Sequence, residues 1–241
     1  MKKLFLLFLL FGFCRTLSTS ELDKLAIKHG TNKSSKKHDY CVIYEKYFSK
    51  ARHEEINFLE IGLAECNSAF MWEEYFPNAK LYFIDSIPRF VEAGNRKLSD
   101  RSLCFLVDQA NKNALMDFVE EVGVKFDFII DDGGHMMNQQ ISSFEVLFSY
   151  VKSGGVYVIE DLHTSYWKYY GGSGSKQDPK AGYGTTINFL KNLIDDVNII
   201  GAKASQSLRT CPDWLKRQLT FYQENIESIH FYNSVCFIFK R

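Results

Sequence analysis

The sequence predicts an α/β fold built on a mostly parallel sheet. From about residue 56 onward, short apolar runs alternate with longer amphipathic segments, which is the pattern of βαβ units. Several apolar runs end in acidic residues, as expected for strands whose carboxyl ends form a ligand-binding edge. The chain has 241 residues, of which 46% are hydrophobic, and no Pro- or Ser-rich linker divides it. One domain with a sizeable core is therefore expected.

The elements follow from the apolar runs and the signals between them. Strands are expected at 56–62, 80–85, 103–108, 126–131 and 156–161. Helices are expected near 68–76, 138–150 and 185–197, and around 214–225. Lys152 to Gly155 predict a turn, and two β runs within 228–240 predict a hairpin that closes the sheet. The glycine-rich stretch 171–184 predicts a mobile lid loop over the site.

The first twenty residues differ from the rest. Lys2 and Lys3 precede an apolar run, 4–13, that is too short to span a bilayer, and small residues follow it. Residues 1–20 therefore predict a signal peptide and an exported or secreted protein, with a cytoplasmic protein as the alternative. No further transmembrane span is expected. Residues 21–241 then form one domain, in which 21–53 is an N-terminal helical cap.

Charge and cysteine content exclude several classes of function. Lys plus Arg and Asp plus Glu both number 29, so the formal net charge is zero and no basic block predicts nucleic-acid binding. The six cysteines include no CxxC pair, which argues against a zinc site. A small substrate, neutral or bound with the help of a metal, is a better match for this charge balance.

Acidic residues gather where the predicted strands end, so they should meet at one sheet edge. They are Glu60, Asp85, Asp108, Asp131, Asp132, Glu160 and Asp161. Three of them, Asp132, Glu160 and Asp161, would lie on neighbouring central strands, and clustered carboxylates of this kind select Mg²⁺ or Ca²⁺. His135 follows Asp132 on a glycine turn and is a metal ligand, a general base or a surface residue.

The strand-to-helix turn 59–68 predicts a nucleotide-binding loop. Gly62 would let a ligand approach the backbone, although Cys66 stands where a second glycine is usual. Asp85 occupies the place of a ribose-binding carboxylate, and Asp108 with Gln109 could bind an adenine ring. Each of these residues could instead be an ordinary helix cap.

Together, these stretches resemble the metal-dependent class I S-adenosylmethionine methyltransferases, and most closely the sugar O-methyltransferases that act on macrolide and related glycosides. The matching stretches are 28–48, 59–62, 71–85, 107–109, 128–135, 159–167 and 228–235. The resemblance implies a Rossmann-like class I methyltransferase fold whose seven-stranded sheet has an antiparallel last strand. It also implies two cofactors, S-adenosyl-L-methionine and Mg²⁺.

The resemblance assigns roles to individual residues. Mg²⁺ would bind to Asp132, Glu160 and Asp161, and His135 would be the catalytic base. The cofactor-binding residues would be Thr31, Glu60, Gly62, Asp85, Asp108 and Gln109, with Asp131 supporting the cofactor side or its loop. Cys66 departs from the family's motif glycine.

The expected activity is O-methylation of a sugar or related vicinal diol, dependent on S-adenosylmethionine and Mg²⁺. The acceptor would be a small hydroxylated molecule such as a glycoside. Two alternatives remain open at this point: a catechol-type small-molecule O-methyltransferase, and a catalytically idle exported binding protein that keeps the fold.

Overall fold

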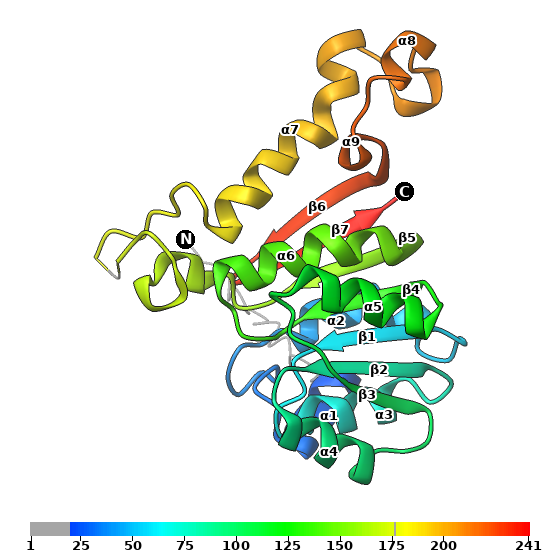
Figure 1. Ribbon diagram of the computed structural model, residues 1–241, viewed down its shortest axis with the longest axis vertical. Helices are drawn as coiled ribbons and strands as arrows, with labels where there is room; N and C mark the ends of the chain where they lie inside the picture. Colours follow the sequence, from blue (N-terminus) through cyan, green and yellow to red (C-terminus); the bar gives the residue numbers. More distant parts are fainter. Residues whose placement is uncertain (1–19, 176) are drawn as a thin grey trace, which may run out of the picture.

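A seven-stranded sheet with helices on both faces organises the protein (Figure 1). The computed structural model describes residues 20–241 except residue 176. The strands are β1 (Asn57–Ile61), β2 (Lys80–Asp85), β3 (Ser102–Leu106), β4 (Phe126–Asp131), β5 (Val151–Ile159), β6 (Ile226–Tyr232) and β7 (Val235–Lys240). They lie side by side in the order β3-β2-β1-β4-β5-β7-β6.

The predicted fold class is confirmed. β1 pairs in parallel with β2 and β4, and parallel pairing continues to β3 at one side and β5 at the other. β7 is antiparallel to both of its neighbours, β5 and β6. The sheet is therefore the mostly parallel, Rossmann-like sheet with an antiparallel last strand.

The helices connect the strands and cover the sheet. They are α1 (Glu21–His29), α2 (Cys41–Phe48), α3 (Asn67–Tyr75), α4 (Pro88–Lys97), α5 (Lys112–Val122), α6 (Met137–Leu147), α7 (Thr186–Ala204), α8 (Asp213–Lys216) and α9 (Phe221–Asn225). Short 3₁₀ turns follow α2 and α6 at Ser49–Ala51 and Phe148–Tyr150, and others occur at Leu162–Tyr166, Lys168–Tyr170 and Leu208–Thr210. Figure 1 shows α7 running away from the sheet toward α8.

Two apolar clusters divide the core between the faces of the sheet. One contains residues of α1, α2 and α3 together with Phe58, Phe128 and Phe237 from the strands. The other contains residues of α5, α6 and α7 together with neighbouring strand positions such as Leu59 and Ile129. Alternate residues of each strand thus point to opposite helical layers, as the period of two requires.

The N-terminal segment packs against the first of these faces. Ser20 caps α1 by accepting a hydrogen bond from the Asp23 backbone N–H at 3.1 Å. Phe48, at the end of α2, is fully buried and contacts the rings of Trp72, Phe128 and Phe237. This packing holds α2 next to the central strands. The predicted signal peptide lies outside the described residues except for Ser20.

The structure corrects the predicted turn at 152–155. Those residues belong to β5, which begins at Val151 and ends at Ile159. Between the pairs Phe126–Val151 and Phe128–Val156, β5 gains extra residues relative to β4, so the segment forms a bulge. Gly154, with φ of 79°, permits that bulge. Because β5 ends at Ile159, Glu160 and Asp161 follow the strand instead of finishing it.

The predicted helix around 214–225 is also corrected. The chain forms α8, leaves the helix, and starts α9 after Thr220. The Thr220 side chain accepts a hydrogen bond from the Gln223 N–H, and the Gln223 side chain accepts one from the Thr220 N–H. This capping box begins a new helix where the apolar pattern predicted continuity.

Within the described ranges, 20–175 and 177–241, no helix is both long and apolar enough to cross a membrane. The five cysteines of this part of the chain are buried and free. The described residues of the predicted lid, 171–184, carry no helix or strand, and their role as a lid stays a prediction.

Candidate active site

Alternation along the strands separates the acidic residues onto two faces of the sheet. Ile130 packs with the α1–α3 layer and Ile129 with the α5–α7 layer, so Asp131 and Asp132 also point to opposite sides. Asp131 accepts hydrogen bonds from Gln109 and from Ser143 on α6. Asp132 instead contacts Lys33.

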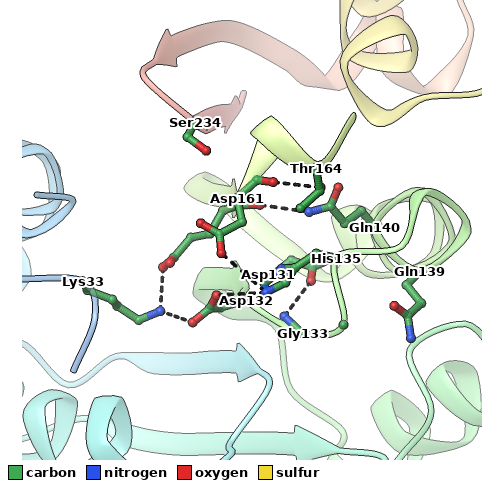
Figure 2. A network of polar contacts seen from close by, with 12 residues as sticks. Lys33, Asp131, Asp132, Gly133, His135, Gln139, Gln140, Asp161, Thr164 and Ser234 are labelled. Carbon is green, nitrogen blue, oxygen red and sulfur yellow. Dashed lines mark hydrogen bonds and ion pairs between the residues drawn. The ribbon is translucent and has the colours of Figure 1, made fainter. Parts of the chain in front are cut away.

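Glu60 and Glu160 point to the same side as Asp132. All three carboxylates meet the ammonium group of Lys33, which is fully buried. The Nζ atom lies 2.8 Å from Glu160 Oε1 and 3.3 Å from Glu60 Oε1, and it also bonds to Asp132 Oδ2 (Figure 2). Glu60 additionally accepts a hydrogen bond from Ser68 at 2.8 Å. One buried cation therefore joins the ends of β1, β4 and β5.

The carboxylates determine the charge of this lysine. Burial acts to lower the pKa of Lys33, but Asp132, Glu160 and Glu60 outweigh it and hold the pKa well above its usual value. The side chain is therefore an ammonium ion at neutral pH. Burial raises the pKa of Glu60 and of Glu160, and in Glu160 the neighbouring Asp132 adds to this effect, so the ammonium group only partly offsets the cost of burying these acids.

A second group forms on the other side of Asp132. Single ligand atoms of Asp132, His135 and Asp161 all lie within 4.8 Å of one another. His135 Nε2 is 3.5 Å from Asp161 Oδ2 and 4.0 Å from Asp132 Oδ1. His135 has φ of 57°, and the tight turn through Gly133 and Gly134 brings its ring over the sheet edge. Figure 2 shows Lys33 and His135 approaching Asp132 from opposite sides.

Each predicted metal ligand is held through one oxygen by the N-terminal segment. Lys33 and Tyr44 both bind Glu160 at Oε1, Lys33 binds Asp132 at Oδ2, and Tyr40 binds Asp161 Oδ1 at 2.7 Å. The other oxygens of two of these ligands, Asp132 Oδ1 and Asp161 Oδ2, face His135. Glu160, the third predicted ligand, is not in the compact group with His135.

Hydrogen bonding and nearby histidines lower the pKa of Asp161. Burial acts to raise the pKa of Asp161, but the hydrogen bond from Tyr40 and the nearby His135, His38 and His163 hold it below its usual value. The backbone of Asp161 has φ of 54°, directly after β5. This turn aims Oδ1 at Tyr40 and Oδ2 at His135.

Asp132, His135 and Asp161 are called the acid–histidine group below. A cavity of about 480 Å³ opens beside this group. It is walled by the loop after β1, the end of β2, the loop after β4 and the segment Gly30–Asn32, and both Asp132 and His135 line it. Of the predicted cofactor residues, those that line it are Thr31, Gly62, Asp85 and Gln109. Its size is typical of a small-molecule site.

The other predicted cofactor residues lie behind or beside this cavity. Glu60 is buried against Lys33, and Asp131 is buried against Gln109 and Ser143. Burial raises the pKa of Asp131 despite these hydrogen bonds. Asp108 is exposed and accepts a hydrogen bond from the Ala110 N–H in the turn before α5, whose N-cap is Asn111. Val107 takes its place in the cavity wall.

Gln109 and Asp85 support the cavity loops as well as lining it. Gln109 donates to Asp131 at 2.9 Å and accepts from the Gly134 N–H at 2.8 Å, which fixes the turn that carries His135. Asp85 accepts from the Leu63 and Ala64 N–H groups, which fixes the loop after β1. Both side chains hold the shape of the wall.

Cys66 replaces the expected glycine without opening the loop. It has φ of 68°, is fully buried and immediately precedes α3. Gly62 is the position that requires glycine, because its φ is 94° and a Cβ there would overlap the Asp132 carbonyl oxygen. The loop after β1 therefore touches the loop after β4 at Gly62.

A second cavity, of about 420 Å³, lies beside the turn that follows Asp161, and Leu162 and His163 of that turn line it. It is formed by the turn after β5, the first half of α7 and the β6–β7 hairpin, and its wall is largely apolar. His163 lines it and lies 3.9 Å from Asp161 Oδ1, with its Nδ1 2.5 Å from Ser234 Oγ. Asp132 and His135 thus line the first cavity, and His163 connects Asp161 to the second.

The sequence does not predict the roles of Lys33, Tyr40 and Tyr44 at the site. They belong to the matching stretch 28–48, but a lysine and two tyrosines without regular spacing carry no sign of burial. A usable signal was the number of acids expected at one edge, because such a cluster requires a buried cation.

Comparison with known proteins agrees with this geometry. No protein-family model matches the chain. The 8-demethyl-8-(2-methoxy-alpha-L-rhamnosyl)-tetracenomycin-C 3'-O-methyltransferase of Streptomyces olivaceus is 33% identical over 190 residues, covering 76% of this chain and 46% of that protein. The mycinamicin VI 2''-O-methyltransferase of Micromonospora griseorubida is 29% identical over 227 residues, covering 91% of this chain and 52% of that protein.

A solved structure of MycE methyltransferase, in complex with Mg, SAH and mycinamycin VI, matches with a TM-score of 0.76 and 27% identity. The match covers 92% of this chain and 54% of that one. The chain belongs to the class I S-adenosylmethionine methyltransferases. The chain spans about half the length of the curated relatives it matches.

Replacing Gly62 by alanine should damage the larger cavity. The added methyl group overlaps the Asp132 carbonyl and must adopt a left-handed φ, so we expect a loss of stability of about 1–3 kcal/mol. Urea denaturation measures it. Gly184→Ala is the matched control, because Gly184 also has positive φ but has open space around its Cβ position. Equal losses for the two variants would contradict the close approach at Gly62.

Proposed function

We propose that this methyltransferase transfers a methyl group from S-adenosylmethionine to a hydroxyl of a sugar or related vicinal diol, with Mg²⁺ as the second cofactor. The observation that carries the proposal is that Asp132 and His135 belong to the acid–histidine group and also line the larger cavity. A proton-accepting group, a set of oxygen ligands and a cofactor-sized space thus share one edge of the sheet.

The residues present suit a hard divalent cation. Carboxylate oxygens of Asp132 and Asp161 approach one another from adjoining loops, and the pKa of Asp161 lies below its usual value because Tyr40 and nearby histidines favour its charged form. Oxygen-rich sets of this kind favour Mg²⁺. Asp132, Asp161 and Glu160 would hold the ion, with Glu160 Oε1 remaining on Lys33 and Tyr44.

The larger cavity suits the nucleoside cofactor. Its walls come from the carboxyl ends of β1, β2 and β4, where open α/β sheets bind ligands. Asp85 reaches it at the end of β2 and apolar side chains such as Ile87 and Phe90 line it nearby. The relatives named above, whose names describe sugar O-methyltransferases, support the same assignment.

The acceptor is proposed to enter from the second cavity. Apolar side chains there, including Ile187 and Phe231, would hold the body of the molecule, while His163 and Ser234 provide polar contacts close to Asp161. A hydroxyl reaching past Asp161 would meet His135 Nε2. The cofactor and the acceptor would then approach the acid group from opposite sides.

The side chains divide the chemistry between them. When bound, Mg²⁺ lowers the pKa of a hydroxyl group and S-adenosylmethionine supplies the methyl group. His135 accepts the hydroxyl proton at Nε2, while Asp161 beside it stabilises the protonated ring. Gln109 keeps the His135 turn in place through the Gly134 N–H. Positioning by the protein supplies much of the rate.

The proposal is tested by calorimetry with S-adenosylhomocysteine and by methyl-transfer assays with glycosides and catechols as acceptors. We expect cofactor binding, and Mg²⁺-dependent transfer to glycosides. Failure to bind the cofactor would make this a catalytically idle protein that keeps the fold. Transfer to catechols alone would identify the catechol-type activity instead.

Replacing His135 by alanine should remove the base. We expect turnover to fall about 10²- to 10⁴-fold, the usual contribution of general base catalysis, while S-adenosylhomocysteine still binds. Single-turnover assays and calorimetry measure the two effects. His53→Ala is the control, since His53 is exposed at the opposite end of β1. Turnover near that of the wild type would exclude His135 as the base.

Replacing Asp132 by asparagine should act through the metal. The amide keeps the shape but removes one of the charges that balance Lys33 and a divalent ion, so the Mg²⁺ concentration for half-maximal activity should rise at least about tenfold. Titration of activity with Mg²⁺ measures it. Asp117→Asn, an exposed position on α5, is the control. An unchanged Mg²⁺ requirement would remove Asp132 from the metal site.

A further inference from the structure

We propose that Lys33 is a positioning residue that couples the divalent-metal site to the cofactor cavity. The inference rests on the proposed function and adds a regulatory link between its two cofactors. Lys33 itself is buried away from both ligands and touches neither the cavity nor the His135 side of the acids. Its effect is exerted through the residues that it holds.

The first link runs from Lys33 to the metal ligands. Its ammonium group binds Asp132 Oδ2 and Glu160 Oε1, the oxygens that face the N-terminal segment. Bonds of this kind fix the direction of a carboxylate and so the position of its second oxygen. Without Lys33, the buried Glu160 and the partly buried Asp132 would lie next to Glu60 with no counter-charge.

The second link runs from Lys33 to the cavity wall. The three residues before it, Gly30 to Asn32, line the cavity, and the Lys33 N–H donates to Thr31 Oγ1 at 3.4 Å. The Lys33 carbonyl accepts from the Tyr40 N–H at 2.9 Å. Tyr40 in turn binds Asp161 through its hydroxyl. The wall segment is thus tied at two points to the acids.

The geometry gives a reciprocal effect. A cation that orders Asp132 and Glu160 also orders the position of Lys33 and hence the wall formed by Gly30–Asn32. A cofactor that contacts this wall favours the same position of Lys33. By linkage, each ligand must then increase the affinity for the other by the same factor.

The experiment measures that factor. The affinity for S-adenosylhomocysteine is determined by calorimetry with and without Mn²⁺, in the wild type and in Lys33→Met. We expect each ligand to tighten the other on the order of tenfold in the wild type, a typical coupling, and the factor to fall close to one in the variant. Lys36→Met is the matched control, because Lys36 lies in the same segment but is exposed.

The outcomes separate this inference from the proposed function. If the wild type does not bind S-adenosylhomocysteine at all, the proposed function is wrong. If it binds both ligands independently, or if Lys33→Met keeps the wild-type coupling, only the role of Lys33 is wrong. Lys33→Arg, which keeps the charge, should recover part of the coupling.

A measurement on the wild type alone covers the case in which Lys33→Met does not fold. Mn²⁺ added without cofactor should slow amide hydrogen exchange in residues 30–41, because the ion orders the acids that hold Lys33 and Tyr40. α5, on the other face of the sheet, serves as the internal reference. Unchanged exchange in 30–41 would overturn the inference.

Discussion

The structure depends on one buried ion cluster, the ammonium group of Lys33 among the carboxylates of Glu60, Asp132 and Glu160. Burial raises the pKa of Glu60 and Glu160 and Lys33 opposes that effect, so the acids at the end of the sheet depend on a cation that comes from a segment outside it. The cluster therefore joins the N-terminal helices to three central strands. It also determines which oxygens of Asp132 and Glu160 are turned away from Lys33.

Strand geometry explains why two adjacent aspartates have unrelated roles. Asp131 turns toward α6, where Gln109 and Ser143 satisfy it, and Asp132 turns toward Lys33. At the end of β4, Asp131 thus supports the loop on one face of the sheet. Asp132 belongs to the ion cluster on the other face. The left-handed backbone at Asp161 completes the arrangement after the next strand.

Much of the fold followed from the sequence, because apolar runs such as 80–85 and 126–131 have one reading in an alternating α/β pattern. The acids at the sheet edge followed from the same register. The bulge at 152–155 and the break before Thr220 depend on local hydrogen bonds that periodicity does not record. The burial of Lys33 depends on contacts with residues as distant as Glu160, which no local pattern encodes.

The contacts of Tyr40 and Tyr44 bear on how small a working unit of this protein can be. A fragment starting at β1 would keep all seven strands and each acid at the sheet edge. It would nevertheless lack Lys33, Tyr40 and Tyr44. These side chains each bind an oxygen of Asp132, Glu160 or Asp161, and the fragment would expose the acids without them. The helices that precede the sheet are thus as much a part of the site as the strands, and designs that shorten or transplant this domain must carry both.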